Sequence, residues 1–255
     1  MKKRMYRAIA LLLLTASLLS CTGCLFKPEP KPMYVLMYHH LVESGTDLNA
    51  WTLTVDRFRE DMQWLKDNGY NTVLPRELAA GEELPENPVL ITFDDGYASN
   101  YHLALPILEE LECKAVIALI TQRVDSGNPE FLSWEQCKAL HDSGLVELGS
   151  HTHDSHSGEK PGILRRDNES REDYEARIFT DLQTSVDLIK ANVGSEVTYF
   201  AHPHGQKDEW AEDFVKGLFP VTTTSEVAVA DLNNGIQDLP RYNISMDYPL
   251  SHYMK

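Results

Sequence analysis

The chain has 255 residues, of which 42% are hydrophobic and 24% are charged. These proportions exclude a disordered or multi-span membrane protein, and the length allows one large domain or two small ones. Acidic residues outnumber basic ones by 39 to 23, and because the resulting net charge of −16 repels phosphate backbones, we expect no nucleic-acid partner. Four cysteines are too few for a disulfide scaffold.

The N-terminus has the layout of a bacterial export signal. Basic residues precede a hydrophobic run over 8–19 that is too short to span a bilayer comfortably. The run ends Leu18-Leu19-Ser20-Cys21, which resembles a lipobox. The resemblance implies cleavage after residue 20 and lipid attachment to Cys21, and a plain secretory signal with a chance cysteine is the alternative.

A short proline-rich segment follows the expected cleavage site. Prolines alternate with charged residues up to Pro32, which is typical of an extended tether. We therefore expect a signal peptide over 1–20, a tether over 21–32 and a single domain over 33–255. Lipidation would anchor that domain to the outer face of the bacterial cell membrane.

The body of the chain alternates between strand-like and helix-like segments. Short β-rich runs predict strands at 33–39, 89–93, 115–120, 145–148, 198–201, 221–224 and 239–244. Helical periodicity and capping residues predict helices at 55–68, 100–111, 134–141 and 171–192. This alternation is typical of an α/β fold with a mainly parallel sheet, and the number of strands suits a distorted, incomplete (β/α) barrel.

Residues with catalytic chemistry follow several of these strands, at the edge where such folds place their active sites. The first group is Asp94-Asp95-Gly96, which directly follows the strand over 89–93. Adjacent carboxylates raise each other's pKa unless a cation lies nearby, so the pair suggests a metal site. An ordinary Asp-Gly turn is the simpler alternative.

The second group is a cluster of three histidines, His151, His153 and His156. His151 and His156 would diverge on a helix or on a strand, so they converge only if the chain turns between them. Neutral imidazoles together with a carboxylate form a ligand set typical of zinc. A polar surface loop is the alternative.

The third group is a turn, His202-Pro203-His204-Gly205, that follows the strand over 198–201. A Pro/Gly turn of this kind can present backbone N–H groups to a substrate. Taken by itself, it is only a turn.

Together these three groups resemble the NodB-homology polysaccharide deacetylases (carbohydrate esterase family four). The branch containing the poly-N-acetylglucosamine deacetylases is similar in the segments 35–40, 151–156 and 239–241. The resemblance implies a metal-dependent hydrolase that removes N-acetyl groups from an N-acetylhexosamine polymer at the cell surface. The chain departs from the main family at Ala201, where arginine is common, and at His204, where tyrosine is common.

Within this resemblance we assign one divalent metal, zinc, to Asp95, His151 and His156. Asp94 is the expected general base, because Asp95 cannot easily serve as both ligand and base. His153 is the rival ligand, with a surface or supporting role expected instead.

Two further assignments concern the orientation of Asp94 and the oxyanion. Arg241 is the candidate to orient Asp94, with a surface arginine as the alternative. The oxyanion is assigned to the metal and a backbone N–H of the Pro203-His204 turn, which makes these two residues the expected substrate contacts.

The general acid is assigned to His39, at the end of the first strand. His252 is among the last four residues of the printed sequence, where chains fray, and His40 would point to the other side of a continuing strand. Two other functions stay open: an inactive carbohydrate-binding lipoprotein on the same fold, and an O-acetyl esterase using the same centre.

Overall fold

The structure, a computed structural model, describes residues 29, 31–45, 48–156 and 162–254. The expected signal peptide over 1–20, with Cys21 after it, lies outside the described residues. The strands are β1 (Pro32–Tyr38), β2 (His40–Val42), β3 (Thr52–Thr54), β4 (Asn71–Thr72), β5 (Pro88–Phe93), β6 (Ala115–Leu119), β7 (Val146–Ser150), β8 (Tyr199–Ala201), β9 (Val221–Thr223), β10 (Ala230–Asp231) and β11 (Tyr242–Asn243). β1 thus begins one residue before the expected strand.

The helices surround these strands. The α-helices are α2 (Val55–Asp67), α3 (Pro75–Ala80), α4 (Leu105–Leu111), α5 (Thr121–Asp125), α6 (Trp134–Asp142), α7 (Arg171–Val193), α8 (Glu212–Leu218) and α9 (Leu250–Tyr253). Short η segments are η1 (Asn100–Ala104), η2 (Pro203–Gly205) and η3 (Leu232–Asn234). No helix in the described part of the chain combines the length and hydrophobicity needed to cross a membrane.

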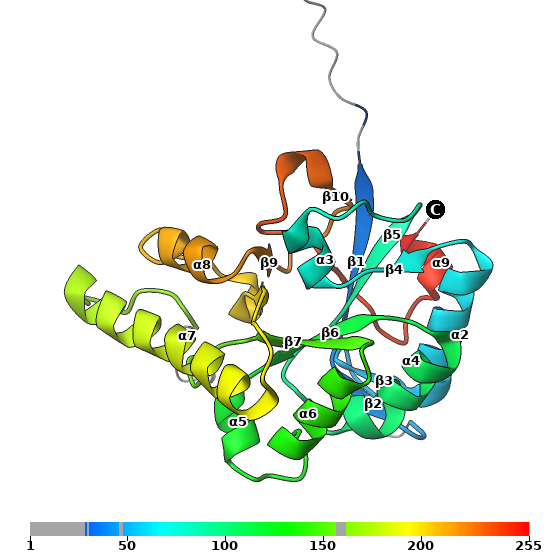
Figure 1. Cartoon of the computed structure of the whole chain (residues 1–255), viewed down its shortest axis with the longest axis horizontal. Helices are drawn as coiled ribbons and strands as arrows, with labels where there is room; N and C mark the ends of the chain where they lie inside the picture. Colours follow the sequence, from blue (N-terminus) through cyan, green and yellow to red (C-terminus); the bar gives the residue numbers. More distant parts are fainter. Residues whose placement is uncertain (1–28, 30, 46–47, 157–161, 255) are drawn as a thin grey trace, which may run out of the picture. The chain divides into compact units, whose positions relative to one another are not determined.

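The sheet is curled and mostly parallel. Its strand order is β10-β1-β5-β6-β7-β8-β9, with β10 antiparallel to β1 and the other neighbours parallel (Figure 1). The segment after β10 spans the gap between the two ends: Leu239 bridges to β9, and β11 pairs with β1. The predicted distorted barrel in a single domain is confirmed, although the expected strand over 239–244 is regular only at Tyr242 and Asn243.

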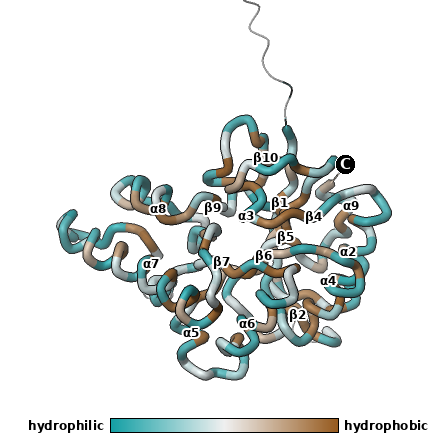
Figure 2. Tube along the Cα trace, viewed as in Figure 1, coloured by the Kyte–Doolittle hydropathy of each residue, from teal (hydrophilic) through white to brown (hydrophobic). Residues whose placement is uncertain are grey.

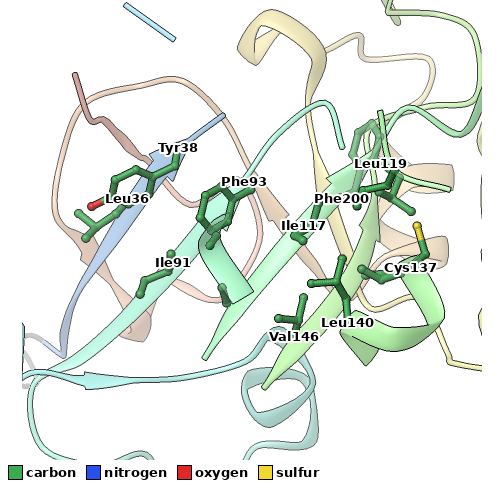
Figure 3. Close-up of a cluster of buried hydrophobic side chains, with 14 of the residues drawn as sticks. Leu36, Tyr38, Ile91, Phe93, Ile117, Leu119, Cys137, Leu140, Val146 and Phe200 are labelled. Atoms are coloured by element: carbon green, nitrogen blue, oxygen red, sulfur yellow. The ribbon is translucent and has the colours of Figure 1, made fainter. Parts of the chain in front are cut away.

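Alternation along the strands separates two hydrophobic layers. Residues such as Leu36, Ile91 and Ile117 form one buried cluster with side chains of the helices, and Leu140 of α6 lies in it near Val146 (Figure 3). Residues of the opposite parity, including Leu90 and Val116, form a second cluster on the other face of the sheet. In Figure 2 the hydrophobic colour accordingly follows the central strands.

Local sequence signals explain most helix ends. The Thr54 hydroxyl caps α2 by accepting a hydrogen bond from the Arg57 N–H, and Ser133 with Gln136 forms a capping box on α6. The expected helix over 100–111 instead begins as the π-helix η1 before becoming α4. Pro106 accounts for this difference, because it has no N–H to donate to the carbonyl four residues earlier.

Strand register brings the ends of neighbouring strands together at one edge of the sheet. Tyr38 of β1 is paired with Phe93 of β5, and the Asp94 N–H donates to the Tyr38 carbonyl. His39 and Asp94 therefore leave the sheet side by side. Cys113 and Cys137 are buried free thiols.

Candidate active site

A cleft of about 450 Å³ opens at this edge of the sheet. Its volume is within the usual range for small-molecule sites. Its lining consists of Met37, His39, Trp51, Asp94, Asp95, Tyr97, His151, His156, His202, His204, Gly205, Ser225 and Arg241. The structure therefore brings together every expected catalytic and metal-binding side chain, although these lie up to about 200 positions apart in the sequence.

Asp95, His151 and His156 form a group that can hold a metal ion. Their potential ligand atoms all lie within 4.8 Å of one another, and His156 Nε2 is 3.8 Å from Asp95 Oδ1. Ligand atoms around a tetrahedral zinc, each bonded at about 2.1 Å, are about 3.4 Å apart, so only a small adjustment is needed. Among the described residues no group donates a hydrogen bond to the buried Asp95 Oδ1, although Arg123 Nη1 lies 3.2 Å away.

The tautomer of His151 is fixed in the form that a metal requires. His151 Nδ1 lies 2.7 Å from the carbonyl oxygen of Ala201, which can only accept, so Nδ1 carries the proton. Nε2 is then left with a lone pair. This arrangement, in which the second ring nitrogen donates to a carbonyl, is the usual support of a metal-ligating histidine.

The electrostatics keep both imidazoles neutral at pH 7. Burial lowers the pKa of His151 to about 4, with a contribution from His156 and despite the opposing charge of Asp94. Burial also lowers the pKa of His156 to about 4, and His204, whose ring lies 4.7 Å from that of His156, adds to the effect. Neutral imidazoles bind a cation without first losing a proton.

The turn between the two histidines depends on residues outside the motif. Asp181 of α7 accepts hydrogen bonds from the N–H groups of His153 and Asp154 at 2.9 and 2.8 Å. Thr152, a buried β-branched residue, is held at φ = +79°, a conformation that is strained for such a side chain. This bend lets His151 and His156 face the same point.

His153 lies away from the group. Its Nδ1 is 2.9 Å from Thr121 Oγ1 at the start of α5, and it does not line the cleft. His153, the rival ligand, therefore does not belong to the metal-binding group.

Asp94 is held by Arg241, as the sequence suggested. Arg241 Nη1 donates to Asp94 Oδ1 at 2.8 Å, while its Nε donates to the Thr224 carbonyl oxygen at the same distance. Burial alone would raise the pKa of Asp94, but the charge and hydrogen bond of Arg241 hold this pKa well below its ordinary value. Asp94 is thus ionised at neutral pH, with Oδ2 3.9 Å from His151 Nε2.

The three candidate acids occupy different environments. His39 lines the cleft, and its buried Nδ1 has no hydrogen-bond partner among the described residues. His40 faces elsewhere, with Nδ1 3.0 Å from Ser99 Oγ, and exposed His252 stacks on Tyr248. Only His39 of the three is near Asp94.

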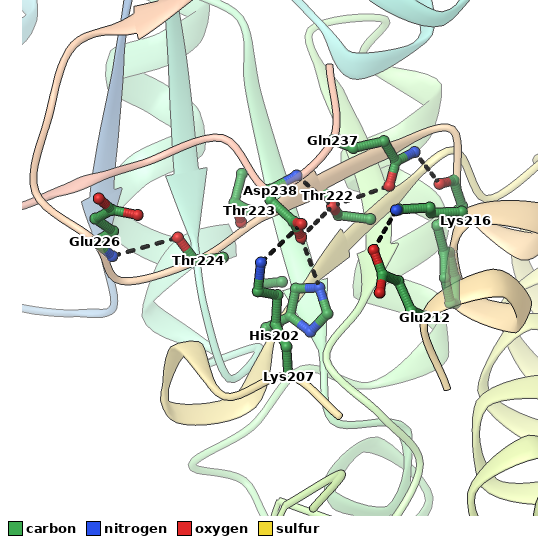
Figure 4. A network of polar contacts seen from close by, with 12 residues as sticks. His202, Lys207, Glu212, Lys216, Thr222, Thr223, Thr224, Glu226, Gln237 and Asp238 are labelled. Carbon is green, nitrogen blue, oxygen red and sulfur yellow. Dashed lines mark hydrogen bonds and ion pairs between the residues drawn. The ribbon is translucent and has the colours of Figure 1, made fainter. Parts of the chain in front are cut away.

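The turn over 202–205 is held in place by Asp238, which contacts one residue at the start of the turn and one just after its end. His202 Nε2 lies 3.3 Å from Asp238 Oδ1, and Lys207 Nζ lies 2.8 Å from Asp238 Oδ2 (Figure 4). His204, at φ = +56°, reaches the cleft, whereas Pro203 is buried and does not line it. Of the two expected substrate contacts, only His204 is thus placed to meet a substrate directly.

No local pattern in the sequence points to three other residues near the site. Arg123 and Asp181 lie on helices distant in sequence from the motifs that they contact, and Trp51 comes from a loop without periodicity. Such contacts depend on tertiary packing, which local patterns do not encode.

Removing either histidine of the group should abolish metal binding. We expect His151→Ala and His156→Ala to retain less than about one tenth of the metal bound by the wild type, since each loses one of three protein ligands. His153→Ala is the matched control and should stay loaded. Elemental analysis of the purified proteins measures this, and full occupancy in both variants would refute the assignment.

Comparison with known proteins places the chain in a family. Residues 81–218, more than half of the chain, match the family Polysaccharide deacetylase. The chain therefore belongs to the polysaccharide deacetylases, a class of hydrolases, as its motifs indicated.

The chain spans only part of the length of the curated relatives that it matches. The chain is 27% identical to the poly-beta-1,6-N-acetyl-D-glucosamine N-deacetylase of Escherichia coli K12, over 89% of this chain but 39% of that protein. It is 26% identical to the enzyme of the same name from Staphylococcus aureus MRSA252, over 85% of this chain and 76% of that protein. The solved de-N-acetylase from Aggregatibacter actinomycetemcomitans superposes with a TM-score of 0.76 at 25% identity, covering 87% of this chain and 98% of that one.

Proposed function

We propose that this protein is a metal-dependent N-deacetylase of an N-acetylhexosamine polysaccharide. The observation that carries the proposal is the presence, in one cleft, of a three-residue ligand group, an ionised carboxylate beside it and a buried histidine that leaves the neighbouring strand end. A metal in this group would act as a Lewis acid toward water and the acetyl carbonyl, and two imidazoles with one carboxylate suit zinc.

The side chains of this cleft can divide the remaining chemistry among them. Asp94, ionised and oriented by Arg241, accepts a proton from the water that attacks the acetyl carbon. The carbon–nitrogen bond then breaks, and His39 donates a proton to the leaving nitrogen, so that acetate and a free amine result. We assign the developing oxyanion to the backbone N–H of His204, a residue of the turn that lines the cleft.

The substrate class is proposed on the strength of the relatives. The N-deacetylases named above act on poly-beta-1,6-N-acetyl-D-glucosamine, and a cleft open to solvent can admit one sugar of a long chain. Chitin fragments and peptidoglycan glycan contain the same acetamido group, so we assign the chemical class rather than one polymer.

An inactive sugar-binding protein would not need this set of groups. A pure binding site has no use for adjacent aspartates whose repulsion must be compensated, nor for a buried histidine whose Nδ1 finds no hydrogen-bond partner in the described part of the chain. An O-acetyl esterase would use the same centre and is the second candidate.

Acetate release from matched substrates separates these functions. We expect release from N-acetylglucosamine oligomers to exceed release from O-acetylated sugar oligomers at equal concentration. A preference for the O-acetyl substrate would favour the esterase, and release from neither would favour the inactive binder.

We further propose that Cys21 carries lipid and anchors the protein outside the bacterial cell membrane. Several acyl chains bind a membrane firmly, whereas one chain binds only marginally. Cys21→Ala should therefore move most of the protein from the membrane to the soluble fraction, and Cys24→Ala is the control. Membrane association that persists in Cys21→Ala would contradict the anchor.

A further inference from the structure

One large apolar side chain in the cleft has no role in the chemistry described so far. Trp51 is 50% exposed, and it is the most exposed of the four tryptophans, all of which the structure describes. It lines the same cleft as the metal-binding group. Contact with a ligand would remove this apolar surface from water, which is favourable.

The backbone around Trp51 is fixed by three hydrogen bonds. The Trp51 N–H donates to Asn49 Oδ1 at 2.8 Å, and the Trp51 carbonyl accepts from the His40 N–H at 3.1 Å. From β11, Asn243 Nδ2 donates to the Ala50 carbonyl at 3.0 Å. The indole is therefore presented from a backbone bonded to two separate parts of the barrel, so little conformational entropy is lost when a ligand packs on it.

The indole also contacts the expected general acid. The ring centroids of Trp51 and His39 are 4.7 Å apart, with the planes tilted by 59°. A group that packs on the exposed part of the indole is consequently held next to the His39 imidazole.

We propose that Trp51 is the sugar-binding platform of this cleft, on which the apolar face of a pyranose ring packs so that its acetamido nitrogen lies within reach of His39. A hexosamine with equatorial substituents presents such a face, because its axial positions carry only hydrogen. This inference rests on the proposed function, since it concerns the substrate of the same cleft.

Kinetics on an oligomer distinguish a platform from a purely structural residue. Trp51→Ala should raise KM for an N-acetylglucosamine tetramer by about tenfold or more, with kcat changed less than about threefold, because packing on the platform is equal in ground state and transition state. Trp51→Phe should recover most of the affinity. A structural role through His39 would instead lower kcat and leave KM unchanged, which would overturn the proposal.

Tyr248→Ala provides the matched control. Tyr248 is also 50% exposed and also stacks on a histidine, but it does not line the cleft. Its removal should leave KM and kcat unchanged. An equal rise in KM in Tyr248→Ala would show that the effect is not specific to the cleft and would overturn the proposal.

Direct binding gives a second readout that does not depend on turnover. In an Asp94→Asn background, calorimetry with the tetramer should show a Kd about tenfold or more higher when Trp51 is replaced by Ala. An unchanged Kd, with normal acetate release by the wild type, would overturn the platform alone. A wild type that releases no acetate would overturn the proposed function and the platform with it.

Discussion

Replacing Asp94 by Asn is expected to lower kcat for acetate release by about 10²–10⁴-fold, the usual contribution of a general base. The amide has nearly the shape of the carboxylate but cannot take up a proton. Metal content should remain near that of the wild type, because Asp94 is not part of the ligand group. Turnover per metal-loaded molecule is therefore the quantity to measure, and near-normal kcat would mean that the base lies elsewhere.

The same substitution should also destabilise the fold. Arg241 has 1% of its side chain exposed and would lose its ionic partner, and breaking one half of a buried pair costs about 3–5 kcal/mol. Denaturant unfolding measures this separately from kcat. Asp142→Asn, an exposed position paired with Lys138 on α6, is the control and should change neither quantity appreciably.

Replacing His39 by Ala should lower kcat on the N-acetyl substrate by about 10²–10⁴-fold without loss of metal. The leaving nitrogen is strongly basic and must receive a proton as the bond to carbon breaks. Burial lowers the pKa of His39 below its ordinary value, so its protonated form is a stronger acid but is less populated at neutral pH. His252→Ala, in contrast, should be almost unaffected, since that ring is stacked on Tyr248 outside the cleft.

The leaving group supplies the sharpest test of this role. An ester such as 4-nitrophenyl acetate has a weakly basic leaving group that departs without an acid. His39→Ala should lose much less activity on this ester than on the amide, whereas Asp94→Asn should lose activity on both. Equal losses on the two substrates in His39→Ala, or a large loss in His252→Ala, would contradict the assignment of the acid.

The main elements of the barrel could be predicted because their signals are local. β-rich runs mark β1, β5, β6 and β7, and the caps Thr54 and Ser133 mark the starts of α2 and α6. The two-residue strands β4 and β10 and short helices such as α5 were not predicted, because these segments contain too little periodicity. Their structure follows from contacts with neighbours, as the pairing of β4 with β5 illustrates.

The site was predictable to the extent that its residues directly follow strands. Asp94, Asp95 and His151 are brought together by parallel register alone, which a sequence reader can anticipate. The bend that turns His156 back toward them depends on Asp181 and on a strained Thr152, and neither leaves a pattern in the sequence. The platform at Trp51 was missed for the same reason.

The measurement that tests the central claim most directly is acetate release from N-acetylglucosamine oligomers by the wild-type protein before and after metal removal. Chelation followed by dialysis should reduce the rate by at least about 10²-fold, and one equivalent of Zn²⁺ should restore most of it, since the ligand group supplies a single site. The chelated His151→Ala protein should not recover under the same treatment. Undiminished acetate release by metal-free protein would contradict the account.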